Sequence, residues 1–185
     1  MSDKDTNALK TNTAVALIET VEVDQLADIL KASGYRVTPA EQNGRTQLMS
    51  ASQGVGFAVR FGNAVPGTDA YIDYTLSCAV QVQGELPVDL VPSWNRTKRF
   101  ARLSAQAQFL VLEMDVIVGG GVAERHLRSM TELWDRLIQE FLLHLRNRPA
   151  MAAAEQAAVL APIVPEAHVE SDRDAGADPV GATMQ

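Results

Sequence analysis

The chain has little of what the most specialised protein classes require. It contains one cysteine, Cys78, among 185 residues, so it forms no internal disulfide and no cysteine-rich zinc site. Its 12 glycines are too few for a collagen-like chain. No apolar run approaches the roughly 18 residues of a membrane-spanning helix, so no membrane partner is expected. A content of 46% hydrophobic and 21% charged residues is typical of a globular domain.

Basic residues are also few: the chain has 16 Lys+Arg against 23 Asp+Glu, which gives a formal net charge of −7. Because nucleic-acid phosphates repel an acidic protein, no nucleic-acid partner is expected. The first residues, Met1-Ser2-Asp3-Lys4-Asp5, carry acids where a secretory leader has bases, so the expected location is cytoplasmic.

The distribution of charge and apolar residues predicts three segments. Residues 1–19 are expected to be a flexible N-terminal segment, and residues 20–148 to form one α+β domain. Residues 149–185 carry six acids and one base, are rich in alanine and proline, and lack aromatic side chains. Such a segment buries too little apolar surface to offset its ordering entropy, so a mostly disordered tail is expected. Within it, residues 150–158 extend the preceding helix for a turn or two, and residues 159–164 are a candidate docking segment.

Apolar residues at steps of three and four predict three helices. The first covers residues 24–33, and Gly34 can take the left-handed conformation that ends a helix. A short helix is expected over residues 89–97. The longest covers residues 123–148, and Pro149 is expected to end it.

Alternation of apolar and polar residues predicts the strands, which are expected over residues 36–40, 45–51, 55–61, 70–83, 99–105 and 109–118. Asn43-Gly44 tolerates the positive φ values of a tight turn and joins the first two. In the longest strand the even positions from 72 to 82 are apolar and face a core, which makes Cys78 a buried structural thiol. The order helix–strands–helix–two strands–long helix predicts an α+β fold, an antiparallel sheet with helices packed on one face.

Three segments together carry a family resemblance. They are Ser93-Trp94-Asn95-Arg96-Thr97-Lys98-Arg99-Phe100-Ala101-Arg102, then Leu112–Asp115 with Gly119–Gly121, and the helix with Trp134 and Phe141. Over residues 20–148 the chain resembles the YbjN-type family, described as putative bacterial sensory transduction regulators. The resemblance departs at residues 105–108, where the family often has an acidic, glycine-containing hairpin turn.

The resemblance carries expectations about fold and function. It implies a fold similar to that of type III secretion chaperones, which dimerise and bind partner polypeptides, and it implies no catalytic residues and no cofactor. The motif residues that it marks as structural are Trp94, Asn95, Phe100, Gly120 and Trp134.

Four bases within seven residues, Arg96, Lys98, Arg99 and Arg102, are the candidate partner-binding group. They could dock an acidic partner or the chain's own tail. The alternative is a solvated helix end whose neighbouring aromatic side chains fill the core, because exposed ion pairs contribute little.

The remaining chemical patterns favour a protein that is not an enzyme. Gly119–Gly121 lacks the lysine and hydroxyl residue of a phosphate-binding loop, and a strand-to-helix turn explains it better. The three histidines are isolated, so no metal site is expected. Glu113 and Asp115 share a strand face and could perform acid–base chemistry, but without a nucleophile motif they are more typical of solvent-facing residues.

The sequence therefore predicts a non-enzymatic, chaperone-like or regulatory module that binds another polypeptide and forms a homodimer. The alternative is a small-molecule sensor with a pocket between sheet and helices. An enzyme of unfamiliar chemistry is a third hypothesis.

Overall fold

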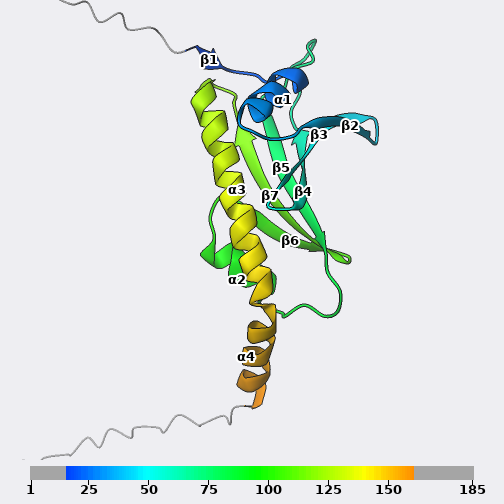
Figure 1. Cartoon of the computed structure of the whole chain (residues 1–185), viewed down its shortest axis with the longest axis vertical. Coiled ribbons are helices and arrows are strands. Elements are labelled where there is room, and N and C mark those ends of the chain that lie inside the picture. Colours follow the sequence, from blue (N-terminus) through cyan, green and yellow to red (C-terminus); the bar gives the residue numbers. More distant parts are fainter. Residues whose placement is uncertain (1–15, 161–185) are drawn as a thin grey trace, which may run out of the picture.

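A six-stranded antiparallel sheet in the order β2-β3-β4-β5-β7-β6 is the centre of the fold in this computed structural model, which describes residues 16–160 (Figure 1). Its strands are β2 (Thr38–Gln42), β3 (Arg45–Ser52), β4 (Val55–Phe61), β5 (Asp73–Gln81), β6 (Arg102–Gln106) and β7 (Phe109–Ile117). A second, two-stranded sheet that the sequence did not predict pairs β1 (Leu17–Ile18) with β8 (Val122–Ala123).

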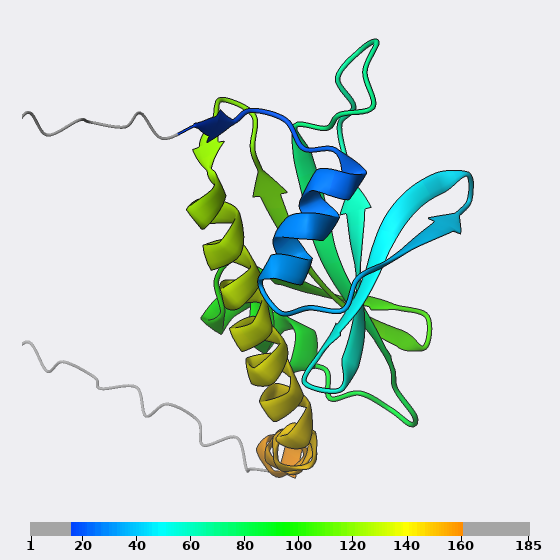
Figure 2. The same cartoon turned by 45° about the horizontal axis from the view of Figure 1, so that its top comes forward.

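The helices α1 (Val23–Ala32), α2 (Leu90–Thr97) and α3 (Glu124–Arg146) pack on one face of the large sheet, as Figure 2 shows. A fourth helix, α4 (Arg148–Leu160), continues past the end of the sheet (Figure 1). The predicted α+β class, the order of elements and the one-sided helical layer are confirmed.

Aromatic side chains fill the space between the sheet and its helices. Trp134 of α3 meets Phe57 of β4 edge to face, with ring centroids 6.0 Å apart. Trp94 of α2 meets Phe141 of α3 in the same way at 5.9 Å. Cys78 of β5 is buried beside this core, and burial raises the pKa of its thiol to about 11. A thiol with that pKa stays protonated near neutral pH, in keeping with a structural role, and the predicted burial of Cys78 is confirmed.

Tight two-residue turns fix the register of strands β2, β3 and β4. Asn43 and Gly44 both have positive φ, at 52° and 72°, so the predicted hairpin is confirmed. Gln53 and Gly54 repeat the geometry between β3 and β4, at 53° and 77°. This second turn sets the register of β3 and β4, in which Gln47 of β3 lies opposite Arg60 of β4.

The β6–β7 turn forms a hairpin with a strained backbone. This is the turn at which the sequence departs from the family pattern. Ala107 has a φ of 51°, a value that costs a residue with a Cβ about 1–2 kcal/mol. Ala107→Gly is therefore expected to raise the free energy of unfolding by about 0.5–1 kcal/mol in a urea titration. Ala105→Gly, in the strand before the turn, is the control and should lower it. A lower stability for Ala107→Gly would contradict this account.

Several sequence predictions about element ends were wrong, beginning with the first predicted strand, which covers Thr38–Gln42 and not residues 36–40. Pro149 does not end the helical segment: α3 ends at Arg146, and Pro149 lies in the first turn of α4, where a missing amide hydrogen leaves no bond unmade. The long strand β5 begins at Asp73, and Ile72 before it is 39% exposed. Strand β6 begins at Arg102, three residues later than predicted.

Only part of each predicted terminal segment lies within the described residues. The helix α4 carries the helical extension expected over residues 150–158. Residues 1–15 and 161–185, with most of the expected flexible segment of residues 1–19 and most of the expected tail, lie outside the described residues. Leu17–Ile18, at the end of that first segment, form β1.

Candidate functional site

The second face of the six-stranded sheet carries no helix in the described part of the chain (Figures 1 and 2). We call it the open face; its side chains include Met49, Ala58, Arg60, Thr75, Ser77, Ala79, Arg102, Phe109, Val111, Glu113, Asp115 and Ile117. These positions alternate with the ones that face the core, as the sequence predicted for β5 and β7, although Val111 among them is itself buried. Any partner that binds the sheet through a face must therefore bind here.

The motif residues Trp94 and Asn95 close the β6 edge of this sheet. The indole Nε1 of Trp94 donates to the Ala101 carbonyl at 3.0 Å. The Asn95 amide pairs with both backbone groups of Leu103, since its nitrogen donates to the carbonyl and its oxygen accepts from the amide, each at 2.9 Å. An unpaired edge strand offers such groups to other chains. The two side chains thus replace a neighbouring strand, which explains why a tryptophan and an asparagine stand together.

One interpretation of the motif expected Phe100 to fill the core, but the structure places it outside the core. Its side chain is 67% exposed and its φ is 74°. A bulky residue at such a φ is an outlier that costs free energy, and such residues concentrate at binding sites. By contrast, Gly120, with a φ of 90°, has the conformation for which glycine is suited. Trp134 is fully buried, in keeping with a structural role.

The four candidate bases do not form one patch, and two of them pair with carboxylates on the helical side. Arg96 of α2 contacts Asp89 at 3.1 Å, with both side chains largely exposed. Lys98 contacts Glu140 of α3 at 2.6 Å, which ties the end of α2 to α3. Their charges are largely compensated within the protein, so neither is a strong attractant for an acidic partner.

The other two bases separate at the start of β6. Arg102 turns onto the open face and contacts Glu113 at 3.2 Å. Arg99 has no ion pair among residues 16–160, and its guanidinium lies 5.4 Å from the ring centre of Phe100. The prediction that these bases bind a partner stays a prediction, and the geometry narrows it to Arg99 beside the exposed Phe100.

A network of ion pairs lies at the middle of the open face. Glu113 of β7 lies between Arg60 of β4 and Arg102 of β6 and contacts both. Arg102 also donates to Asp115 at 2.5 Å, and the Thr75 hydroxyl donates to the same carboxylate at 2.6 Å. The Arg102 hydrogen bond is the main reason why the pKa of Asp115 is lowered. The two carboxylates are thus bound by arginines, an arrangement unlike that of a general acid or base.

The lowered pKa of Asp115 makes part of the stability dependent on pH. A carboxyl with a lower pKa in the folded state stabilises above its unfolded pKa of about 4, and the contribution is lost as the pH falls through the folded value. Asp115→Asn should therefore reduce the free energy of unfolding at pH 7 by up to about 1 kcal/mol, because the side chain is partly exposed and solvent screens the pair. Urea titrations at pH 7 and at about pH 3.5 should show the difference shrinking in acid.

The matched control is Asp69→Asn in the exposed loop before β5, since Asp69 has no ion pair among residues 16–160. It should show no such pH-dependent difference. An equal loss for Asp115→Asn at both pH values would argue that the network does not depend on its charge.

Apolar side chains lie at the margins of the open face. Ile117, at the end of β7, is 66% exposed, and Phe109, at its start, is 38% exposed. Met49 of β3 is also 38% exposed. Phe100, two residues before the start of β6, is a further exposed apolar side chain. Sequence reasoning put Ile117 on the same strand face as Glu113 and Asp115 but singled none of these apolar residues out, although large apolar residues at polar positions of an alternating strand are a detectable signal.

The described residues show no arrangement for metal chemistry, since no group of three or more His, Cys, Asp or Glu side chains lies close enough together in residues 16–160 to hold an ion. His144 of α3 is partly buried and packs against α2. Its Nε2 is 2.8 Å from the Leu90 carbonyl, and its ring lies edge to face with Trp94 at 5.5 Å. His144 is therefore part of the contact between α2 and α3.

No helix within residues 16–160 is both long and apolar enough to cross a membrane. Among curated proteins, none matches the sequence. One family model matches residues 22–147, which is more than half of the chain, and it is described as "YbjN: Putative bacterial sensory transduction regulator". The match spans the sheet, its helical layer and the Trp94–Asn95 closure of the β6 edge, so the chain belongs to the YbjN family.

Proposed function

We propose that this protein is a non-enzymatic regulatory module that binds another polypeptide on the open face. One observation carries the proposal: the sheet buries one face under three helices and leaves the other uncovered, with Ile117 exposed on it and Phe100 exposed two residues before β6 begins. Large apolar side chains left in water favour contact with a partner, because burying them releases free energy.

The mixture of side chains on the open face favours a reversible partner. The central ion pairs are satisfied within the sheet, so a partner need not supply charges to them. The apolar anchors lie at the margins, and small residues such as Ala58 and Ala79 lie between them. An interface with a polar centre suits a transient complex better than a permanent one.

The β6 edge supports binding through the face of the sheet. Because Asn95 takes both backbone groups of Leu103, a partner strand cannot pair with them. At the other edge, Pro39 of β2 has no amide hydrogen to offer. Strand addition at either edge is thus disfavoured, whereas the face stays accessible.

The test compares matched charge substitutions on the two sides of the molecule. Ala79→Arg places a long cation on the open face, and Glu132→Arg does so on the exposed side of α3. Both variants should keep the wild-type circular dichroism. Ala79→Arg is expected to lose the polypeptide that the wild-type protein captures from its native cells, and Glu132→Arg to retain it. Loss only with Glu132→Arg would refute binding at the open face.

A homodimer with chaperone-like activity is the finer form of the proposal. It is supported by the family membership and by the apolar margins of the open face, which could serve a second copy. Light scattering coupled to size exclusion at micromolar concentration should give twice the chain mass. A monomer at all concentrations would remove the dimer and leave polypeptide binding to be tested by the charge variants.

A further inference from the structure

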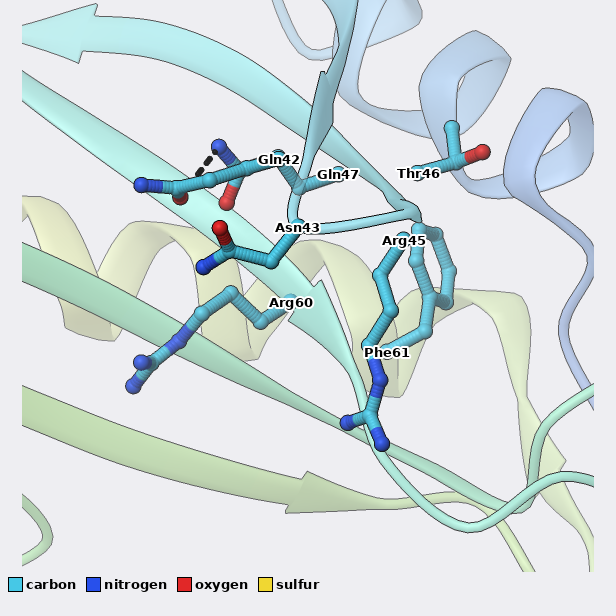
Figure 3. Close-up of a pocket in the computed structure, with 7 residues that line it drawn as sticks. All are labelled: Gln42, Asn43, Arg45, Thr46, Gln47, Arg60 and Phe61. Carbon is cyan, nitrogen blue, oxygen red and sulfur yellow. Dashed lines mark hydrogen bonds between the residues drawn. The ribbon is translucent and has the colours of Figure 1, made fainter.

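A pocket of about 410 Å³ lies beside the β2–β3 turn, and neither Phe100 nor Ile117 lines it. Its volume falls in the range of small-molecule sites. It is lined by Gln42, Asn43, Arg45, Thr46, Gln47, Arg60 and Phe61, shown in Figure 3. The pocket lies at a hairpin, whereas the sensor hypothesis placed a pocket between sheet and helices, where Trp94 and Trp134 fill the space.

The pocket is positively charged in an acidic protein. Two arginines line it, and none of the lining residues is acidic. The Arg45 guanidinium makes no ion pair or side-chain hydrogen bond within residues 16–160 and keeps its donors available. Arg60 uses one terminal nitrogen on Glu113, which leaves its other donors free. An unneutralised guanidinium beside a second one attracts an anion of the right shape.

Neutral amides complete the lining and supply further donors. The Gln47 side-chain nitrogen donates to the Gln42 side-chain oxygen at 2.9 Å, which orients both amides. The Gln42 nitrogen then stays free to donate, and the Asn43 amide lies over the same pocket (Figure 3). These groups can bind carboxylate oxygens without adding charge.

The spacing of the two arginines selects the form of the anion. Gln47 lies opposite Arg60, and Arg45 is two residues along the same strand, so the Arg45 and Arg60 Cα atoms are diagonal neighbours about 7–8 Å apart. In Figure 3 their guanidinium groups end at separate points of the pocket. Two separated cationic groups match a ligand with two separated anionic groups better than one compact anion.

We propose that this pocket binds a small dicarboxylate, with one carboxylate on Arg45 and the other on Arg60. The guanidinium plane presents two parallel N–H donors to a carboxylate, which gives both affinity and orientation. Arg60 also lies on the open face, but the inference stands without a polypeptide partner there, because it rests on the free donors of Arg45 and Arg60 and not on the exposed apolar side chains.

The test uses glutarate as the probe and the full-length protein. Calorimetric titration should show saturable binding of one glutarate per chain, and thermal unfolding should shift upward with glutarate concentration. Acetate and inorganic phosphate at the same ionic strength should bind at least about tenfold more weakly, because each reaches only one guanidinium. Equal affinity for phosphate would overturn the dicarboxylate assignment.

Arg45→Gln is the decisive variant, because Arg45 holds no ion pair whose loss could weaken the fold. It should weaken glutarate binding about tenfold or more while unfolding at the wild-type temperature without ligand. Arg36→Gln, at an exposed arginine outside the pocket, is the matched control and should bind glutarate as the wild type does. Undiminished binding by Arg45→Gln, or no binding by the wild type at millimolar glutarate, would refute the site.

Discussion

Trp94→Ala is expected to lower the free energy of unfolding by about 4 kcal/mol, the largest effect of any substitution considered for this protein. The indole is fully buried between the sheet and α3, where it meets Phe141 and His144. Its removal leaves a cavity and also leaves the Ala101 carbonyl without its donor. Urea denaturation followed by circular dichroism measures the loss without relying on tryptophan fluorescence.

Trp94→Phe separates the two contributions. It keeps most of the buried ring area but has no N–H to donate, so it should cost about 1–2 kcal/mol. If Trp94→Ala costs less than about 1 kcal/mol, the indole does not anchor α2 to the sheet, and the structural explanation of the motif is wrong.

Phe100→Gly is expected to weaken partner binding without lowering the free energy of unfolding. Glycine adopts the φ of 74° without a Cβ clash, so the variant should be as stable as the wild type or more stable by up to about 1 kcal/mol. Partner binding should weaken about tenfold or more, because burying an exposed phenylalanine side chain contributes about 1.5–3 kcal/mol. Urea titration and a binding assay with the captured polypeptide measure the two quantities.

The control for Phe100→Gly is Val88→Gly, at another exposed apolar residue, 86% exposed and located before α2. It should leave partner affinity unchanged, since Val88 does not belong to the open face. Unchanged affinity for Phe100→Gly together with lower stability would show that Phe100 serves the fold and not a partner.

Local patterns predicted most of the architecture because they act over a few residues. Alternation in β5 and β7 and the turn at Asn43-Gly44 survive in the folded protein almost unchanged. The prediction that Pro149 ends the helix failed because proline is excluded from a helix interior but allowed in a first turn. Whether Pro149 lies in an interior or in a first turn depends on where the previous helix ends. The pairing of β1 with β8 joins residues far apart in the chain, and no local pattern specifies it.

The candidate site was less predictable, because it depends on which face each side chain takes. Four neighbouring bases suggested one patch, but the start of β6 at Arg102 sends that residue to the open face and leaves Arg99 outside the strand. The Arg45–Arg60 pair was within reach of sequence reasoning. Two-residue turns at both ends of β3 fix the register that brings the two arginines to one face. What the sequence could not show is that the hairpin leaves a pocket there.

The measurement that tests the central claim most directly is photocrosslinking from the two sides of the sheet. A benzophenone amino acid is placed at Ala79 on the open face and, in a second protein, at Glu132 on the exposed side of α3. After irradiation in native cells, the account predicts a discrete polypeptide adduct from position 79 and none from position 132. An adduct from position 132 alone would contradict it, because the partner would then bind the helical layer and not the uncovered face of the sheet.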